Sequence, residues 1–295
     1  MDLTAVPEPL RDTAAVALQA AFGDAVDAIA VADGGASGAH KFRVETSTGP
    51  HLLRLEAMRG PLRNPHQYAC LRAASDAGIA PPTRFADDAL GALVMPWLDV
   101  RPLVEYPGGP SARARAVGEL LARLHALTPV FPQHGDYLDN LTRLLGFLTA
   151  SGRVGPGLLE PHRAAFERIR SSFAWNPDEF VSAHNDPNEF NLLFDGRRLW
   201  LIDWETASRN DPFIDLATAA VHAAPTEGLR DELLAAALGR APSGDDRARL
   251  GLAGLLTQLY GGCILLLITT DPAVPTHTDL TAPTAEEFRA HVASG

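Results

Sequence analysis

Two short β-like segments joined by Asp195-Gly196 constrain the fold of this chain more than any other feature. Residues 192–194 and 198–202 are mostly apolar, and an Asp-Gly pair between two such runs is a strong signal for a tight β-hairpin. A hairpin folds back on itself, so Asn191 at its entry and Asp203 at its exit lie at the same open end. Because paired strands are about 5 Å apart, we expect their side-chain oxygens to converge.

The residues around this hairpin indicate a particular chemistry. Amide and carboxylate oxygens such as those of Asn191 and Asp203 suit Mg²⁺, which keeps waters and shares phosphate oxygens. Asp186 lies five residues before Asn191 and places a further carboxylate on the adjoining loop. A metal together with a free carboxylate is what phosphoryl transfer to a hydroxyl requires. Taken singly, each residue also fits an ordinary loop network, a turn cap or a surface loop.

Composition limits the classes of function. The net charge of −11 and a pI near 5.3 argue against nucleic acid as a partner, since phosphate backbones require a basic surface. Lys41 is the only lysine, so any phosphate-binding cation must be Lys41 or an arginine. Cys70 and Cys263 show no paired spacing, and no signal peptide is visible. We therefore expect a cytoplasmic protein.

One apolar run, residues 251–268, is long enough to raise the question of a membrane span. It contains the polar residues Thr257 and Gln258, and only Arg247 and Arg249 flank it as an orientation signal. A buried core helix is the favoured interpretation, and a membrane span is the alternative. We expect no membrane partner.

The pattern changes character along the chain. Residues 28–32, 41–46 and 52–55 predict a meander of three strands, residues 64–77 predict a helix, and residues 91–95 predict another buried strand. Helical periodicity then dominates. Further helices are expected from residue 111 and over residues 137–149, 158–173, 212–222, 228–238 and 247–268. The order predicts a small β-rich lobe followed by a larger, mainly helical one.

The stretch 184–217, which reads H-N-D-P-N-E-F-N-L-L-F-D-G-R-R-L-W-L-I-D-W-E-T-A-S-R-N-D-P-F-I-D-L-A, resembles the aminoglycoside phosphotransferase superfamily. Within that superfamily it is similar to the choline and ethanolamine kinases. The resemblance implies an α+β, bilobal, eukaryotic-like protein kinase fold. It also implies a nucleotide-binding lobe over residues 1–95, a hinge over residues 96–100, and a catalytic and acceptor-binding lobe over residues 101–295.

The same resemblance implies roles for the residues of the motif. Asp186 is expected to be the catalytic base, with His184 supporting its loop. Asn191 and Asp203 are expected to bind Mg²⁺. Asp215 resembles the family aspartate that anchors the catalytic loop from the next helix, which is a structural role.

The resemblance also implies an ATP site in the first lobe. Gly35, Ser37 and Gly38 lie between the first two strands, where such kinases place a loop whose backbone N–H groups contact phosphates; a plain hairpin turn would look the same. Arg54, on the third strand, stands where the family keeps its phosphate-binding cation. A charge inside an apolar strand is costly unless it is paired or bound to a ligand. Lys41 is the alternative, although we expect it to face solvent.

The segment after the fourth strand is expected to contact adenine. Met95 resembles the gatekeeper, and the Pro96 carbonyl and the Leu98 N–H are expected to bond the base; proline lacks a donor but keeps its carbonyl. Hydrophobic packing alone would also explain Met95 and Leu98.

One position departs from the family. The helix after the third strand normally supplies a glutamate that holds the cation, and here Gln67 stands at that place. Glu56, two residues beyond Arg54 on the same strand face, is a candidate substitute. This departure favours a weak or inactive kinase, so a pseudokinase-like nucleotide-binding regulatory protein stays an alternative.

The acceptor is less constrained. A quaternary ammonium favours aromatic faces, but after Trp204 the chain offers only Phe213, Tyr260 and Phe288, which does not predict a full cage. An aminoglycoside acceptor would instead require a pocket lined by acidic side chains. The acidic residues available for such a pocket are Glu205, Asp211, Asp271 and Asp279.

The leading hypothesis is transfer of the γ-phosphate of ATP to a hydroxyl of a small metabolite, with amine-bearing ones as candidates. An aminoglycoside-type antibiotic kinase is the alternative enzyme. A monomer or weak homodimer is expected.

Overall fold

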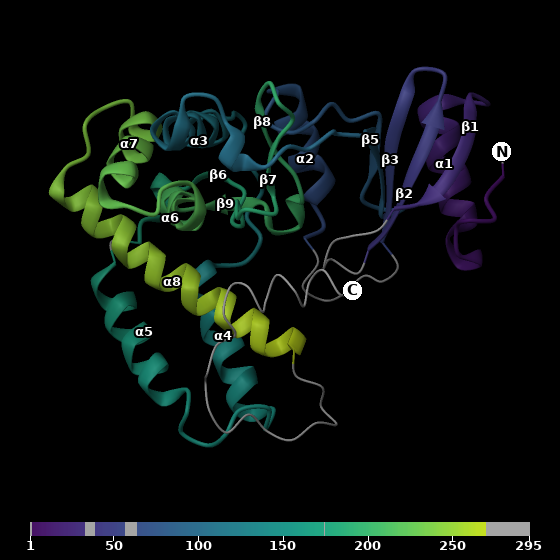
Figure 1. Cartoon of the computed structure of the whole chain (residues 1–295). Helices are drawn as coiled ribbons and strands as arrows, with labels where there is room; N and C mark the ends of the chain where they lie inside the picture. Colours follow the sequence, from purple (N-terminus) through teal and green to yellow (C-terminus); the bar gives the residue numbers. More distant parts are fainter. Residues whose placement is uncertain (1, 33–38, 57–63, 174, 270–295) are drawn as a thin grey trace. The chain divides into compact units, whose positions relative to one another are not determined.

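The computed structural model describes residues 2–32, 39–56, 64–173 and 175–269 (Figure 1). By its contacts the chain divides into two compact units. The first contains the residues up to Glu105 together with Asn191–Ala207. The second contains Tyr106–Phe190 and continues from Ser208. The hairpin predicted from Asp195-Gly196 therefore packs with the N-terminal part of the chain.

The first unit is built on a five-stranded antiparallel sheet with strand order β1-β2-β3-β5-β4 (Figure 1). Its strands are β1 (Val26–Val31), β2 (Ala39–Thr46), β3 (Gly49–Glu56), β4 (Phe85–Asp87) and β5 (Ala92–Pro96). The predicted meander and the predicted fourth strand are confirmed. The short strand β4 was not predicted, because three residues are too few to show an alternating pattern. In the register of β2, β3 and β5, Lys41 pairs with Arg54 and Arg54 with Leu93.

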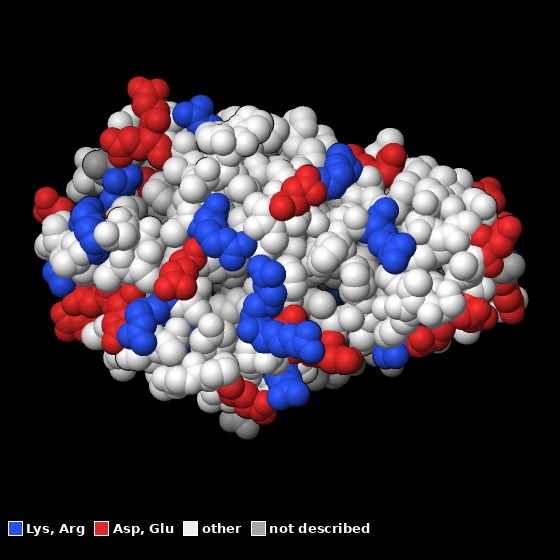
Figure 2. Space-filling view, turned by 90° about the horizontal axis from the view of Figure 1, so that it is seen from above, with Lys and Arg blue, Asp and Glu red and all other residues white. Residues whose placement is uncertain are grey.

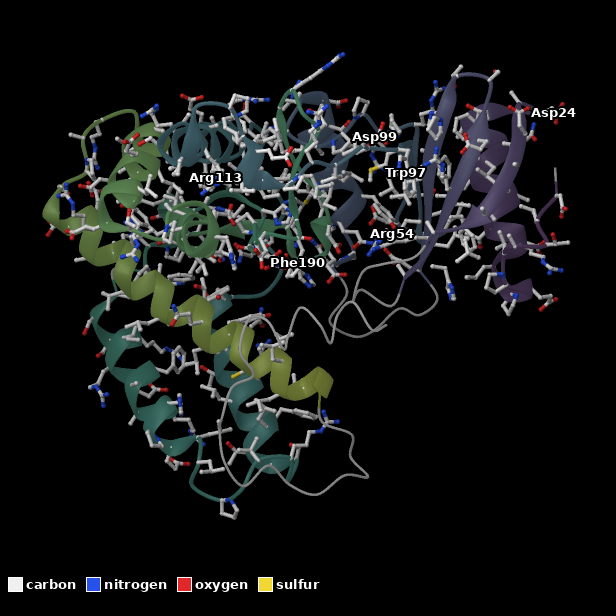
Figure 3. The ribbon with its side chains drawn as sticks, in the orientation of Figure 1. Asp24, Arg54, Trp97, Asp99, Arg113 and Phe190 are labelled. Carbon is white, nitrogen blue, oxygen red and sulfur yellow. The ribbon has the colours of Figure 1, made fainter. Side chains whose placement is uncertain are left out.

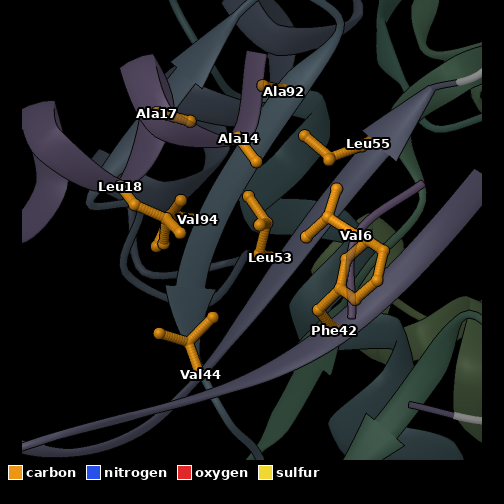
Figure 4. Close-up of a cluster of buried hydrophobic side chains, with 10 residues drawn as sticks. All are labelled: Val6, Ala14, Ala17, Leu18, Phe42, Val44, Leu53, Leu55, Ala92 and Val94. Carbon is orange, nitrogen blue, oxygen red and sulfur yellow. The ribbon is translucent and has the colours of Figure 1, made fainter. Parts of the chain in front are cut away.

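One face of this sheet is covered by a helix that was not predicted, α1 (Arg11–Phe22), which follows the short η1 (Glu8–Leu10). Small side chains on α1 let it lie close to the strands. Leu53 and Leu55 of β3 point into this core and are fully buried. Arg54, between them, points to the opposite face. Figure 4 shows the buried cluster: Val6, Ala14, Ala17, Leu18, Phe42, Val44, Leu53, Leu55, Ala92 and Val94.

The rest of the first unit contains helix α2 (Gln67–Asp76), η2 (Leu103–Glu105), the hairpin strands β7 (Leu192–Phe194) and β8 (Leu199–Leu201), and η4 (Trp204–Thr206). The hairpin is confirmed, with Leu192 opposite Leu201. At its turn the Asp195 carboxylate accepts a hydrogen bond from the Trp200 indole at 2.7 Å, and Gly196 has φ +86°. Only glycine adopts that conformation readily.

The second unit is mainly helical. Its elements are α3 (Gly109–His125), α4 (Tyr137–Ala150), α5 (Glu160–Ser172), η3 (Pro177–Glu179), β6 (Val181–Ala183), β9 (Ser208–Asn210), α6 (Pro212–Ala223), α7 (Glu227–Leu238) and α8 (Gly244–Thr269). The predicted helices are present to within a few residues at their ends. Side-chain caps explain several starts: Asp136 accepts from Asp139 N–H, and Thr226 accepts from Leu229 N–H.

Helix α8 packs against α4, α5 and α6. Its segment Gly244–Leu267 is long and apolar enough to cross a membrane, with a mean hydropathy of 1.8, and 22% of its apolar window is buried. The helix is therefore less buried than the core helix expected from the sequence, and length and composition alone are weak grounds for a span.

On the face shown in Figure 2, basic and acidic side chains lie interspersed, separated by uncharged areas. Among the described residues, charged side chains form pairs such as Arg247 with Asp231 at 2.7 Å and Arg43 with Glu45 at 2.7 Å, whichever face they lie on. Exposed pairs of this kind contribute little to stability.

Candidate active site

The open end of the β7–β8 hairpin pairs Asn191 with Ile202, the residue that precedes Asp203. Ile202 N–H donates to the Asn191 carbonyl at 3.0 Å, so the pairing continues one residue beyond the strands, and Asp203 follows directly. Asp203 has φ +62°, a left-handed conformation that aspartate tolerates better than most residues. The chain turns there into η4, and about a quarter of the Asp203 side chain is exposed.

Arg54 faces this carboxylate from β3. Its guanidinium Nη2 lies 3.6 Å from Asp203 Oδ1 and 3.7 Å from Glu205 Oε2. Arg54 is itself buried. Burial opposes its charge, yet Asp203, then Tyr68, Glu56 and Glu205, together raise the pKa of Arg54 above its usual range. The strand cation predicted from the sequence is therefore buried, charged and directed at the predicted metal ligand.

Lys41 lies on the same side of the sheet as Arg54, its partner across β2 and β3. It lines the same cavity as Arg54 and Asp203. Burial lowers the pKa of Lys41, while the charge of Asp203 opposes that shift. The expectation that Lys41 faces solvent is wrong, because its register with Arg54 places it on the cavity side.

The cavity has a volume of about 230 Å³ and lies within the first unit. All three predicted adenine-contacting residues, Met95, Pro96 and Leu98, line it. Figure 3 labels Arg54 and Trp97, two further lining residues. The apolar walls come from Leu52, Leu71, Pro81, Leu93, Val100, Leu193 and Ile202. Apolar walls with a few charged groups are typical of a ligand site. The predicted phosphate loop, Gly35, Ser37 and Gly38, lies outside the described residues.

The predicted catalytic loop belongs to the second unit and is held by Asp215. The buried carboxylate of Asp215 accepts the backbone N–H of His184 at 2.9 Å and that of Asn185 at 2.6 Å. Its Oδ2 also lies 3.0 Å from Nε2 of His125, on α3. The anchoring role expected of Asp215 is thus present in the geometry. His125 was missed, because it lies 90 residues earlier in the chain and no local pattern connects the two.

A second set of bonds shapes the turn before Asp186. Asn185 has φ +68°. Its side chain accepts from Asn210 Nδ2 at 2.6 Å and donates to Ser208 Oγ at 2.9 Å, both on β9, which pairs with β6. His184 is fully buried, whereas Asp186 is half-buried and accepts from Asn188 Nδ2 at 2.8 Å. The loop therefore fixes the backbone on either side of the half-buried Asp186.

Asp215→Asn is expected to lower the free energy of unfolding by about 3 kcal/mol, since one acceptor oxygen is replaced by an amide that opposes a buried N–H donor. Denaturant titration measures this change. Asp231→Asn, which alters an exposed pair with Arg247, is the matched control and should change stability by less than about 1 kcal/mol. Equal losses in the two variants would contradict the anchoring role.

An aromatic wall, defined here as Tyr137, Trp175 and Tyr260, lies near Asp186. The rings of Tyr137 and Tyr260 stack with centroids 5.1 Å apart, and Trp175 lies 6.4 Å from Tyr137. Burial raises the pKa of both tyrosines, and the negative charge of Asp186 raises them further. All three side chains are partly exposed. The Trp175 indole donates to Asp136 Oδ2 at 3.0 Å.

The sequence prediction considered only aromatic residues after Trp204 and so missed Tyr137 and Trp175. Of the three aromatic candidates named from the sequence, only Tyr260 belongs to the wall. Phe213 is buried, and Phe288 lies outside the described residues.

The candidate acids for an aminoglycoside have different environments. Asp211 is fully buried, caps α6 by accepting from Phe213 N–H at 2.9 Å, and pairs with Arg249. It supports the fold. Glu205 is half-exposed near Arg54, while Asp271 and Asp279 lie outside the described residues.

Known structures share this fold. A choline/ethanolamine kinase family protein from Mesorhizobium loti is 25% identical, with a TM-score of 0.65 over 97% of this chain and 100% of its own. The choline kinase LicA from Streptococcus pneumoniae, also solved with AMP, is 15% identical, with a TM-score of 0.66 over 85% of this chain and 89% of its own. A macrolide 2′-phosphotransferase from Brachybacterium faecium is 18% identical, with a TM-score of 0.60 over 95% of this chain and 97% of its own.

These likenesses confirm the α+β, protein kinase-like fold, with a small antiparallel sheet followed by a mainly helical part. Comparison with curated protein sequences gives no match. The family model described as "phosphotransferase enzyme family" matches residues 28–252, which include most of the sheet, the hairpin and the predicted catalytic loop. This chain therefore belongs to the phosphotransferase enzyme family.

Proposed function

We propose that this protein transfers the γ-phosphate of ATP to a hydroxyl of a small, amine-bearing metabolite. The observation that carries the proposal is the cavity of the first unit, in which Arg54, Lys41 and Asp203 share one space with the apolar segment Met95–Leu98. That combination suits a flat apolar base attached to an anionic chain. The structure of LicA with AMP supports nucleotide use by this fold.

A magnesium ion would be held by Asn191 and Asp203. Both carry hard oxygen donors and sit at the open end of one hairpin, a donor set that fits Mg²⁺ with its waters and phosphate oxygens. When bound, the ion offsets negative charge on the phosphate that is transferred. Arg54 and Lys41 bind and orient phosphate oxygens from the strands.

Asp186 accepts the proton of the acceptor hydroxyl. The residue is half-buried, and Asn188 orients its carboxylate by donating to Oδ1. His184 and Asp215 hold the backbone of the loop, so they act on Asp186 only through its position. Asp186 precedes the metal ligand Asn191 by five residues in the chain.

The aromatic wall supports a cationic acceptor. An ammonium group gains from the faces of Trp and Tyr, by about 0.5–2 kcal/mol. The wall is electrostatically coupled to Asp186, and Asp136 adds a carboxylate beside Trp175. An aminoglycoside-type acceptor has less support, because Asp211 is sealed by its pair with Arg249.

A screen of acceptors with labelled ATP and Mg²⁺ tests the proposal. Choline, ethanolamine, thiamine, neutral sugars, aminoglycosides and a macrolide form the panel, and product is measured by mass. We expect phosphorylation of ammonium alcohols. Product from the antibiotics alone would establish the alternative enzyme, and nucleotide binding without any product would favour the pseudokinase-like regulator.

Tyr260→Leu is expected to raise KM for an ammonium alcohol about tenfold while leaving KM for ATP unchanged, because the stacked face near Asp186 is lost. Steady-state kinetics measures both constants. A neutral alcohol of the same shape, with a tert-butyl group in place of trimethylammonium, is the matched control substrate. If its KM rises equally, the wall binds by shape alone and the cationic acceptor is wrong.

We also propose a cytoplasmic enzyme that is a monomer or weak homodimer. Cys70 and Cys263 are both buried free thiols, which fits a reducing compartment. Light scattering across a concentration series measures the oligomeric state.

A further inference from the structure

Glu56 lies at the end of β3, on the same face as Arg54, and only 9% of its side chain is exposed. A buried carboxylate is costly unless several donors satisfy it. Three described groups do so at one oxygen, Oε1. Arg54 Nη1 lies 3.1 Å away, the Tyr68 hydroxyl donates at 2.8 Å, and Gln67 Nε2 also donates. Arg54 is thus bound to an acid of its own strand.

Helix α2 supplies two of these three donors, from its first turn. Gln67 stands where a helix glutamate was expected from the family pattern. Its amide cannot pair with Arg54 as a carboxylate would, but it donates to Glu56 instead. Compared with the family pattern, the negative charge therefore stands on strand β3 and not on helix α2. The helix still contacts the ion pair of Arg54 and Glu56, as a hydrogen-bond donor.

The turn before β5 closes the remaining side of Glu56. Gly91 has φ +65°, and its carbonyl accepts the Glu56 N–H at 2.9 Å. A Cβ at this position would lie 3.2 Å from Glu56 Cβ and 3.3 Å from Oε2. Glycine therefore allows the backbone to pass directly against the carboxylate, so Glu56 has little freedom to move away from Arg54.

The guanidinium of Arg54 is divided between two sets of partners. Nη1 is within hydrogen-bond distance of Glu56 and lies 3.3 Å from the Tyr68 hydroxyl. Nη2 lies 3.6 Å from Asp203 and 3.7 Å from Glu205, beyond hydrogen-bond distance. One nitrogen is anchored, and the other points to the predicted metal ligand. The planar fork of arginine makes this division possible, whereas a lysine ammonium is a single point charge.

We infer that Glu56 is a positioning residue that, held by Gln67, Tyr68 and the turn at Gly91, replaces the missing helix glutamate and aims Arg54 at the nucleotide phosphates. This inference rests on the proposed function, in which Arg54 binds phosphate. It removes the reason to interpret Gln67 as the mark of an inactive kinase, because the ion pair is present with its acid on a different element.

The test is the affinity for a non-hydrolysable ATP analogue with Mg²⁺, measured by calorimetry, which needs no acceptor. Glu56→Gln should weaken binding about tenfold, since a charge-assisted hydrogen bond to Arg54 is lost. Glu45→Gln is the matched control. Glu45 forms the same two-residue pair with Arg43 on β2, but exposed, and its loss should leave the affinity unchanged.

A double-mutant cycle separates positioning from a general loss of structure. If Glu56 acts through Arg54, Glu56→Gln should have little further effect in an Arg54→Met background. Glu56→Gln combined with Gln67→Glu, which returns the charge to the helix, should recover part of the affinity. Additive effects, or a Glu56→Gln affinity equal to that of the wild type, would overturn the inference.

Two further arms keep the test decisive. If Glu56→Gln does not fold, Tyr68→Phe, which removes one donor and keeps the ring, should weaken binding about threefold and should do so only when Arg54 is present. An unchanged Tyr68→Phe affinity would then overturn the inference. Wild-type protein that binds the analogue but phosphorylates no acceptor contradicts the proposed function alone. Failure of the wild type to bind the analogue contradicts both.

Discussion

Asp186→Asn is expected to reduce phosphate transfer about a thousandfold while changing affinity for the ATP analogue less than about twofold. Loss of a general base typically costs between about a hundredfold and ten thousandfold. An asparagine keeps the shape of the side chain and an oxygen that accepts from Asn188, so the loop should keep its geometry. Neither Asn191 nor Asp203 is altered, so the metal ligands remain.

Single-turnover kinetics, with the acceptor found in the screen, measures this effect directly. Asp178→Asn is the control, since Asp178 is an exposed acid on η3, in the same unit. A rate for Asp186→Asn within a factor of about five of wild type would exclude Asp186 as the base.

Asp203→Asn is expected to weaken Mg²⁺-dependent nucleotide binding about a hundredfold, equivalent to about 2.7 kcal/mol. The change removes a full negative charge from the proposed metal site, where Asp203 also lies 3.6 Å from Arg54 Nη2. In the presence of a chelator the wild type and the variant should bind the nucleotide with affinities within a few fold, because the metal contribution is then absent from both.

Calorimetry with and without chelator distinguishes this effect from loss of structure. Asp195→Asn is the matched control from the same hairpin. Asp195 accepts from Trp200 and from backbone N–H groups of the turn, so its substitution should lower stability without changing the magnesium dependence. If the difference between Asp203→Asn and the wild type persists in chelator, Asp203 does not act through the metal.

The hairpin illustrates what local sequence predicts well. Asp195-Gly196 selects a tight turn, the flanking residues are β-like, and the consequence for Asn191 and Asp203 follows from strand geometry alone. The helices of the second unit were also predictable, because a repeat of about 3.6 residues is visible over their length. The family resemblance rested on the same contiguous stretch, residues 184–217.

Several elements and contacts could not be predicted from local sequence patterns. Strands β4 and β9 are three residues each, too short for periodicity, and they exist because β5 and β6 pair with them. Lys41 was assigned to solvent because its strand register with Arg54 was unknown. A shift of one residue reverses the face of every side chain in a strand.

The sequence by itself determined the hairpin, the β-rich start followed by a mainly helical part, and the chemistry expected of Asp186, Asn191 and Asp203. These depend on neighbours a few residues apart. Only the tertiary structure decided that His125 meets Asp215, that Tyr137 and Trp175 join Tyr260, and that Glu56 holds Arg54 with donors from α2. Those contacts join residues far apart in the chain, or side chains whose direction depends on packing. No local spacing encodes them, because the packing of the whole fold selects which distant partners meet.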